Sequence, residues 1–330
     1  MPAQLCWPRG PDLSRWDLIL GIVEEYHWHQ IARFLLTLRR TRFNGHLCLF
    51  AGPGISSATQ HKLKKNGAEV IPYGRRFPFI ADPHPDAPKS LPEPIYIFNY
   101  RHFLYYDYLL KHGHRFRNVL LTDVKDVVFQ KDPFDFPIGD QLYVAMESTS
   151  IPIGDCVFTS DWILAGYGED VLDELKDKEL SCAGTVLGTV EAIRRYLRSM
   201  LDQIQQMRDA YECADQAAHN LMLHRGELQP ATRLYNFRGP VATVGTEANM
   251  AANDRGQLVN EDESVIAIVH QYDRHPELVR LFDKLAYPSV LRRQAATVGR
   301  LGVRTGSAVR RRAGALLSKL GFVRIERQTA

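Results

Sequence analysis

The chain is poor in cysteine and contains no paired-cysteine motif. Its five cysteines, Cys6, Cys48, Cys156, Cys182 and Cys213, are widely spaced among 330 residues. The odd number and the absence of a C-x-x-C pair argue against a disulfide framework and against a structural zinc site. We therefore expect a reduced, cytoplasmic protein.

Long apolar runs are also missing. No stretch approaches the ~18 apolar residues of a membrane-spanning helix. Residues 1–16, "MPAQLCWPRGPDLSRW", lack the basic and apolar regions that define a signal peptide. The sequence predicts a soluble protein without a membrane span.

A large net charge is absent, but the charge is unevenly distributed. The formal net charge is +3, from 41 Lys and Arg against 38 Asp and Glu. From residue 290 onward there are ten basic residues and one acid, Glu326, which leaves 31 basic and 37 acidic residues before that point. We expect a mildly acidic body, residues 1–289, followed by a basic tail, residues 290–330.

The first part of the body alternates strand-like and helix-like segments. Apolar runs at 17–23, 46–52, 68–73 and 118–123 predict strands, and helical spacing or caps predict helices at 28–40, 56–67 and 101–113. A strand at 141–146, a helix at 192–207 and a strand at 263–270 follow. Strands separated by helices predict an α/β fold, a mostly parallel sheet with helices on both faces.

The segment "LLTDVKDVVFQKDPF", residues 120–134, brings carboxylates to the end of a predicted buried strand. Ligands bind beyond the carboxyl ends of parallel strands, and Asp123 lies at such an end. Asp126 can reach the same metal ion only if the chain bends near Val124 and Lys125, because positions i and i+3 of a strand face opposite ways. Asp132, before Pro133, is expected to be a turn residue.

Four segments, taken in order, carry a resemblance to a known family. They are "LLTDVKDVVFQKDPF", "CAGTVLGTVEAIRRYL" (182–197), "DQAAHNLML" (215–223) and "IVHQYDRHPEL" (268–278). The chain resembles nucleotide-sugar-dependent glycosyltransferases of the Rossmann-like GT-A fold over roughly residues 17–280. The resemblance implies a nucleotide-binding half at about 17–150 and an acceptor-side half at 151–289. The spacing Asp-x-x-Asp departs from the usual Asp-x-Asp, so the resemblance does not decide which residue provides the second carboxylate for the metal.

The resemblance implies a metal site made by Asp123, Asp126 and His270. A divalent ion across the two phosphates of the donor stabilises the departing nucleoside diphosphate. A nitrogen ligand favours Mn²⁺ over Mg²⁺. The resemblance implies a nucleotide sugar as the donor, and a UDP-sugar is favoured.

Four residues are expected to bind the donor, and each has a purely structural alternative. Tyr26 could stack on the base or be a hydrophobic staple. Arg101 and Arg274 could neutralise the diphosphate or be surface arginines. Gly184 could admit the donor sugar or be a turn glycine before a helix. No matching acidic cluster follows His27 and His29, and we expect no metal there.

Asp215 and Gln216 are the candidate catalytic residues. A carboxylate here could accept the proton of the acceptor hydroxyl or orient the sugar, whereas the alternative for Asp215 is an N-cap. The expected acceptor is a saccharide or glycolipid in cell-surface glycan synthesis.

The basic tail predicts an amphipathic helix, with Val309, Ala313, Leu316, Leu317 and Leu320 on one face. Such helices bind anionic membrane surfaces, which would make the protein peripheral on the membrane. A disordered tail or an oligomer contact are alternatives, and no nucleic acid is expected as a partner.

Two other functions compete with the glycosyltransferase. A sugar nucleotidyltransferase would carry a Gly-rich basic loop after the first strand, where this chain reads "EEYHWHQ". A non-catalytic glycosyltransferase-like binding module would lack the metal carboxylates.

Overall fold

The computed structural model describes residues 15–74, 79–80, 82–92 and 95–287. Contacts group the chain into two units, residues 1–282 and 283–330. The predicted basic tail, residues 290–330, and Cys6 lie outside the described residues. The predicted boundary at residue 289 and the two halves of the body stay predictions.

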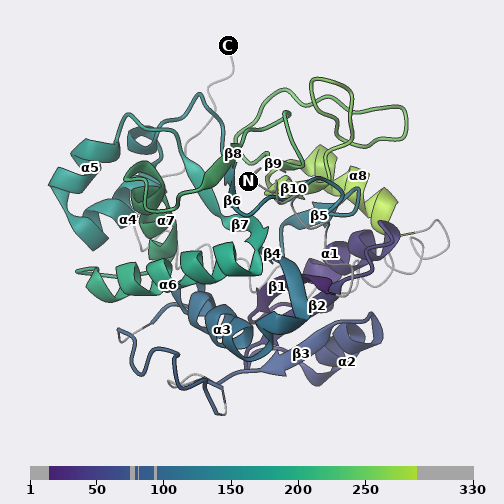
Figure 1. Cartoon of the computed structure of the whole chain (residues 1–330). Coiled ribbons are helices and arrows are strands. Elements are labelled where there is room, and N and C mark those ends of the chain that lie inside the picture. The colour runs from purple at the N-terminus through teal and green to yellow at the C-terminus, as the bar shows by residue number, and fades with distance from the viewer. Residues whose placement is uncertain (1–14, 75–78, 81, 93–94, 288–330) are drawn as a thin grey trace, which may run out of the picture. The chain divides into compact units, whose positions relative to one another are not determined.

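The first unit is built on a seven-stranded sheet with the order β3-β2-β1-β4-β7-β6-β8 (Figure 1). Its strands are β1 Trp16–Val23, β2 His46–Ala51, β3 Glu69–Pro72, β4 Phe116–Thr122, β6 Leu142–Met146, β7 Ser181–Thr189 and β8 Ala231–Leu234. Neighbours β3, β2, β1 and β4 are parallel, β7 is antiparallel to β4 and β6, and β6 and β8 are parallel. The predicted mostly parallel sheet is confirmed.

A second, three-stranded sheet has the order β5-β10-β9. It consists of β5 Val127–Phe129, β10 Ile268–His270 and β9 Val241–Thr243. The strand predicted at 263–270 is therefore restricted to its last three residues. Strand β5 follows β4 after a break of four residues, so the second sheet grows from the carboxyl end of the first.

Eight α-helices lie within the described residues. They are α1 Trp28–Arg40, α2 Ser57–Lys65, α3 Ile97–His112, α4 Val157–Tyr167, α5 Glu169–Leu175, α6 Val190–Gln206, α7 Ala214–His224 and α8 Pro276–Ala286. Short 3₁₀ turns occur at η1 Gly113–Arg115, η2 Ile153–Asp155 and η3 Tyr272–Arg274. No helix in this part of the chain is both long and apolar enough to cross a bilayer.

Helices cover both faces of the large sheet because successive residues of a buried strand point to opposite sides. On β1, Leu18, Leu20 and Ile22 pack with residues of α3 and α6. Ile19 and Val23 pack with residues of α1 and the small sheet. Figure 1 shows β1, β2 and β4 between α3 and α6 on one side and α1 on the other.

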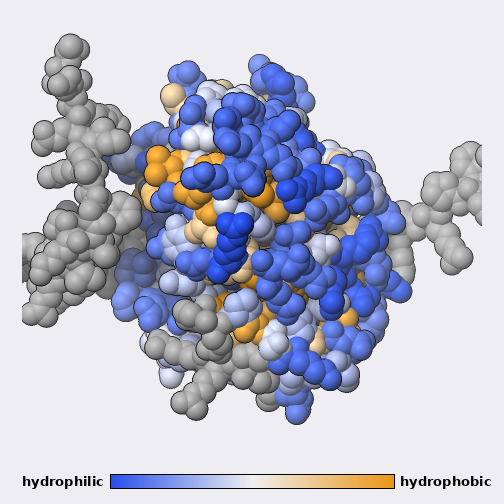
Figure 2. Space-filling view, turned by 90° about the vertical axis from the view of Figure 1, so that its left-hand side faces the viewer, coloured by the Kyte–Doolittle hydropathy of each residue, from blue (hydrophilic) through white to orange (hydrophobic). Residues whose placement is uncertain are grey.

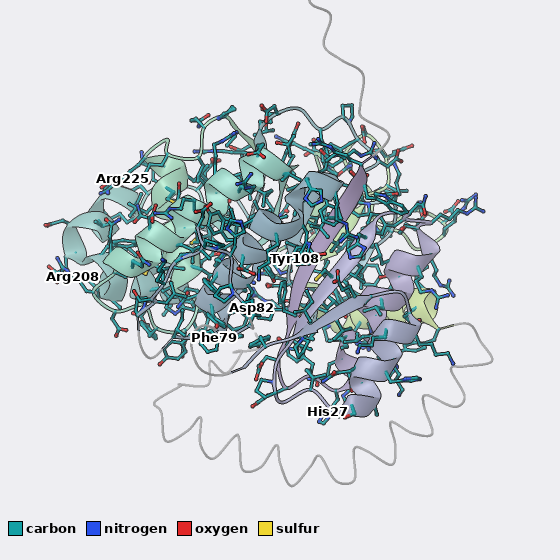
Figure 3. All side chains as sticks on the ribbon, turned by 60° about the horizontal axis from the view of Figure 1, so that its bottom comes forward. His27, Phe79, Asp82, Tyr108, Arg208 and Arg225 are labelled. Atoms are coloured by element: carbon teal, nitrogen blue, oxygen red, sulfur yellow. The ribbon has the colours of Figure 1, made fainter. Side chains whose placement is uncertain are left out.

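Helix α3 starts four residues earlier than the sequence predicts. Tyr96, its extended N-cap, precedes Ile97, so Arg101 lies inside the helix. Tertiary contacts outweigh the modest helix propensity of this first turn. Asn99 donates from Nδ2 to the Ala210 carbonyl at 2.7 Å. Further along, Tyr108 (Figure 3) donates its hydroxyl hydrogen to Glu69 on β3 at 2.8 Å.

Candidate metal and donor site

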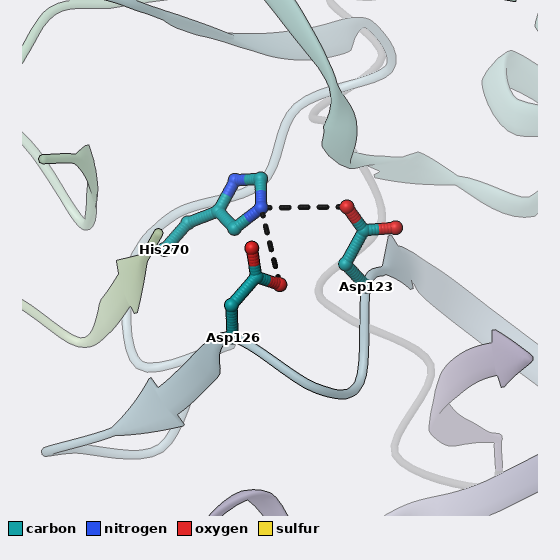
Figure 4. Close-up of side chains that lie close together, drawn as sticks. All are labelled: Asp123, Asp126 and His270. Atoms are coloured by element: carbon teal, nitrogen blue, oxygen red, sulfur yellow. Dashed lines mark ion pairs between the residues drawn. The ribbon is translucent and has the colours of Figure 1, made fainter. Parts of the chain in front are cut away.

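The end of β4 brings two carboxylates together. The strand is buried up to Thr122, residues 124–126 form a bend, and β5 begins at Val127. The bend predicted near Val124 and Lys125 is therefore present. In a straight strand the side chains three residues apart would point to opposite faces. Because of the bend, Asp123 and Asp126 face a common space (Figure 4).

His270 faces both carboxylates from β10. Its Nε2 lies 3.4 Å from Asp123 Oδ2 and 3.7 Å from Asp126 Oδ1 (Figure 4). Strand pairing fixes this position, because His270 is opposite Val127, one residue after Asp126. The ligand atoms of the three residues lie within 4.8 Å of one another.

The electrostatics of this triad fit a cation at its centre. The His270 side chain is 1% exposed, and its Nε2 has no hydrogen-bond partner. Burial alone would lower the pKa of His270, but Cys182 and Asp126 raise it well above its usual range. Burial, with Asp123 nearby, raises the pKa of Asp126. Burial also acts to raise the pKa of Asp123, but Arg101 and His270 outweigh it and lower this pKa to about 2.

Gly184 lies against the triad on β7, not in a turn before a helix as predicted. Residues 183–185 have no partner on β6, because pairing shifts from Val144 opposite Val186 to Ala145 opposite Cys182. The result is a bulge on the β6 side of β7. The Asp123 N–H donates to the Gly184 carbonyl at 2.9 Å, which continues the regular pairing of β4 with β7 by one residue. A Cβ on Gly184 would lie 2.5 Å from both Asp123 Oδ2 and His270 Cε1.

Arg101 is a buried ion-pair residue, so the alternative of a helix-surface arginine is wrong. From the second turn of α3 its Nη1 donates to Asp123 Oδ1, and its Nη2 donates to Asp215 Oδ2 at 2.6 Å. Its side chain is only 6% exposed. The guanidinium thus carries a fixed positive charge beside Asp123, a candidate metal ligand; contact with a donor phosphate stays a prediction.

Asp215 lies in the first turn of α7 and is not its N-cap, which is Cys213. Its carboxylate accepts from Arg101 and lies 3.0 Å from His102 Nε2, and its N–H donates to Asn99 Oδ1 at 2.8 Å. Burial acts to raise the pKa of Asp215, but Arg101 and His102 outweigh it and lower this pKa. Only Oδ1 lacks a partner. This arrangement is more typical of a residue that positions Arg101 than of a residue that takes up a proton.

Gln216 uses both ends of its amide on the β7 bulge. Its Nε2 donates to the Ser181 carbonyl and its Oε1 accepts from the Ala183 N–H, each at 2.8 Å. Asn220, one turn later, accepts from the Ser181 N–H at 2.9 Å. The Gln216 amide therefore holds the β7 backbone at Ser181 and Ala183, directly before Gly184.

Tyr26 and Arg274 lie at the edges of the site. Tyr26 is half-buried and packs on the core on the α1 side of the sheet, as a staple would. Burial, followed by the charges of Asp123 and Asp126, raises the pKa of its phenol. Arg274, in η3, is exposed. His27, at the start of α1 (Figure 3), stacks on His29 with ring centroids 5.8 Å apart.

Glu147 is a further candidate residue that the sequence analysis does not identify. It directly follows β6, and burial raises the pKa of its carboxyl, while His270 and Arg274 act in the opposite direction. The same signal that singles out Asp123 was available, since an acid comes immediately after the predicted strand 141–146.

Comparisons with known proteins find similarity in solved structures. No protein-family model matches the chain, and no curated protein matches it. The galactosyltransferase LgtC, crystallised with donor and acceptor sugar analogues, is 16% identical, with a TM-score of 0.43 over 83% of this chain and 99% of that one. An active-site mutant of LgtC is also 16% identical, with a TM-score of 0.41 and the same coverage. At this identity the functional argument rests on the site residues themselves.

Proposed function

We propose that this protein is a metal-dependent glycosyltransferase. It would transfer a sugar from a nucleoside-diphosphate sugar, with a UDP-sugar as the favoured donor. The acceptor would be a saccharide or a glycolipid, in the cytoplasmic synthesis of cell-surface glycans. The observation that carries the proposal is the triad of Asp123, Asp126 and His270 at the carboxyl end of β4.

The residues of the triad fit a divalent ion. Two carboxylate oxygens and one imidazole nitrogen form a ligand set that suits Mn²⁺ better than Mg²⁺. His270 Nε2 is buried and lies too far from either carboxylate for a short hydrogen bond. Gly184 leaves open the space that a Cβ would fill. When bound, the ion would supply Lewis-acid stabilisation of the diphosphate leaving group.

The other residues of the site would position these ligands and the donor. Arg101 holds Asp123 through Oδ1, which leaves Oδ2 directed at His270. Asp215 pairs with the other end of the guanidinium, and His102 in turn contacts the Asp215 carboxylate. Tyr26 and Arg274, at the edges, are the proposed contacts for the nucleotide.

A carboxylate is still needed to receive the proton of the acceptor hydroxyl in an inverting transfer. Asp215 is committed to Arg101 and His102, whereas Glu147 forms no ion pair with the residues that the structure describes, and its raised pKa suits proton uptake. We therefore propose Glu147 for this role in place of Asp215.

Calorimetric titration of the protein with UDP and with GDP, each with and without Mn²⁺, tests the proposal. Asp126→Asn is the sharpest variant, because Asp126 has no contact with Arg101 and its loss does not leave the guanidinium unbalanced. Metal-dependent binding of one nucleotide should be lost in this variant. Asp132→Asn is the control, since Asp132 only accepts the Phe134 N–H in a turn at 3.0 Å.

If neither UDP, GDP nor any other nucleoside diphosphate binds with Mn²⁺ present, the donor site does not exist and the protein is a binding module. If Asp132→Asn loses binding as fully as Asp126→Asn, the loss reports a damaged fold and the triad is not the metal site.

A further inference from the structure

The two ring nitrogens of His270 have different surroundings. Nε2 faces the carboxylates of Asp123 and Asp126 and has no hydrogen-bond partner. Nδ1 lies on the opposite side of the ring (Figure 4), 3.4 Å from Thr185 Oγ1 and 3.6 Å from Cys182 Sγ. A histidine that binds a metal through one nitrogen usually donates its other N–H to a neighbouring group, which fixes the orientation of the ring. The neighbours of Nδ1 therefore decide how Nε2 is presented to an ion.

The bulge in β7 is what brings both neighbours to the same nitrogen. Thr185 and Cys182 are three positions apart, so a straight strand would point their side chains to opposite faces of the sheet. Residues 183–185 have no partner on β6, and the backbone departs from the regular strand there. Bulges next to a site commonly redirect a side chain. Here the bulge allows the Thr185 hydroxyl and the Cys182 thiol to contact His270 Nδ1 together.

Both neighbours are buried, with Thr185 0% and Cys182 4% exposed. Polar side chains on the hydrophilic surface, one face of which is shown in Figure 2, can hydrogen-bond to water, but a buried hydroxyl needs a partner in the protein. Within the described residues, His270 Nδ1 is the only hydrogen-bond partner of the Thr185 hydroxyl. The Cys182 sulfur also lies 4.0 Å from Gln271 Nε2, and sulfur is a weak acceptor. The Thr185 hydroxyl is therefore the stronger acceptor for an Nδ1 hydrogen.

We propose that Thr185 is a positioning residue for the metal ligand His270, whose Nδ1 hydrogen it accepts, with Cys182 as a second and weaker acceptor. This inference rests on the proposed function, because it assigns a role toward the metal site of that function. The hydrogen bond that one ring nitrogen makes sets which nitrogen is left to bind a metal. With its hydrogen on Nδ1, His270 directs the lone pair of Nε2 toward Asp123 and Asp126.

Titration of the protein with Mn²⁺ alone, followed by calorimetry or electron paramagnetic resonance, tests the role of Thr185. Thr185→Val and Thr185→Ala both remove the hydroxyl, and each should bind Mn²⁺ about 10- to 100-fold more weakly than the wild type. Thr185→Ser keeps a hydroxyl and should restore most of the affinity. Cys182→Ala should weaken the binding by less than Thr185→Val does, because a thiol is the weaker acceptor.

Thr243→Val is the matched control for Thr185→Val. Thr243 lies opposite His270 on the neighbouring strand β9 and is 1% exposed, but its Oγ1 has no hydrogen-bond partner among the described residues. The same substitution at the same depth should therefore leave the Mn²⁺ affinity at the wild-type value. Circular dichroism should show an intact fold in all of these variants.

Wild-type Mn²⁺ affinity in Thr185→Val and Thr185→Ala would overturn the inference. A loss that Thr185→Ser does not reverse, or an equal loss in Thr243→Val, would also overturn it, because the effect would then come from packing and not from the hydroxyl. A loss confined to Cys182→Ala would assign the contact to the thiol and remove Thr185 from this role. A wild type that binds no Mn²⁺ would refute the metal site of the proposed function itself, whereas equal binding by the wild type and the Thr185 variants refutes only the positioning role.

Discussion

Arg101 and Asp215 form a buried ion pair, with Nη2 and Oδ2 2.6 Å apart and side chains 6% and 1% exposed. The same guanidinium also binds Asp123, a proposed metal ligand. One cation from α3 thus joins the end of β4 to the start of α7. Breaking such a pair from one side leaves an uncompensated buried charge.

Arg101→Met should therefore be strongly destabilising. We expect the free energy of unfolding, measured by urea denaturation at pH 7, to fall by about 3–5 kcal/mol. Arg225→Met is the control, because Arg225 and Glu174 form a pair with side chains 41% and 43% exposed. An exposed pair of this kind contributes about 0–1 kcal/mol. Equal losses in the two variants would contradict the buried-pair account.

Gly184→Ala should weaken metal binding without unfolding the protein. The added Cβ would lie 2.5 Å from Asp123 Oδ2 and from His270 Cε1, so one of these ligands must move. Mn²⁺ titration followed by calorimetry or electron paramagnetic resonance should show a loss of affinity. Circular dichroism should show an intact fold.

Gly239→Ala provides the control for this substitution. The nearest atom to its added Cβ is Leu234 Cδ2, at an ordinary 3.8 Å. Its Mn²⁺ affinity should match the wild type. Unchanged affinity in Gly184→Ala would mean that the ion is not bound between Asp123 and His270.

Local sequence rules predicted β1, β2, β3, β4, β6 and the acidic end of β4, because those features depend on periodicity and on where parallel strands end. They did not predict β5, β7, β8 or β9. At the start of the helix predicted over 56–67, Ser56 caps the helix and accepts the Thr59 N–H at 3.2 Å. The position of Asp123 follows from the same rules. His270 was selected only by resemblance, since no local rule joins it to a residue 147 positions earlier.

The partners of the site charges could not be predicted in this way. Arg101 and Asp215 are 114 residues apart, and their pairing depends on how α3 packs near α7. The β7 bulge was mistaken for a turn because "CAGT" is made of small residues, which suit both structures. Its geometry depends on Gln216, a residue of helix α7, whose amide is hydrogen-bonded to Ser181 and Ala183.

Gln216→Ala should loosen the bulge that supports Asp123. The buried Ala183 N–H would lose its acceptor, which costs about 1–3 kcal/mol of unfolding free energy. The Ser181 carbonyl would keep its bond from Asn220 Nδ2 at 2.9 Å. Because the Gly184 carbonyl accepts the Asp123 N–H, we also expect weaker Mn²⁺ binding in the same titration.

Gln205→Ala is the control for this variant, since Gln205 donates to the Ser90 carbonyl at an exposed position. It should change neither the unfolding free energy nor the metal affinity appreciably. A stability loss in Gln216→Ala with full metal affinity would show that the amide supports α7 alone and not the site.

His219 should make the protein less stable in mild acid. Its Nε2 lies 2.9 Å from Ser181 Oγ and its Nδ1 lies 3.0 Å from Tyr196 OH, so the neutral ring satisfies both nitrogens. Burial lowers the pKa of His219 from 6.5 to about 3. Between these values the unfolded chain binds a proton that the folded chain does not, and stability therefore falls as the pH falls.

The size of the effect follows from the pH interval. Going from pH 7.5 to pH 5 crosses about 1.5 units below the unfolded pKa, which corresponds to about 2 kcal/mol. In His219→Gln this contribution disappears, so the difference in unfolding free energy between wild type and variant should narrow by that amount at pH 5. Other buried histidines, such as His102, act equally in both proteins and cancel in the comparison.

His61→Gln, at an exposed position of α2, should keep the pH dependence of the wild type. If His219→Gln keeps it as well, His219 is not buried in its neutral form, and the contacts of α7 with β7 at Ser181 differ from those described.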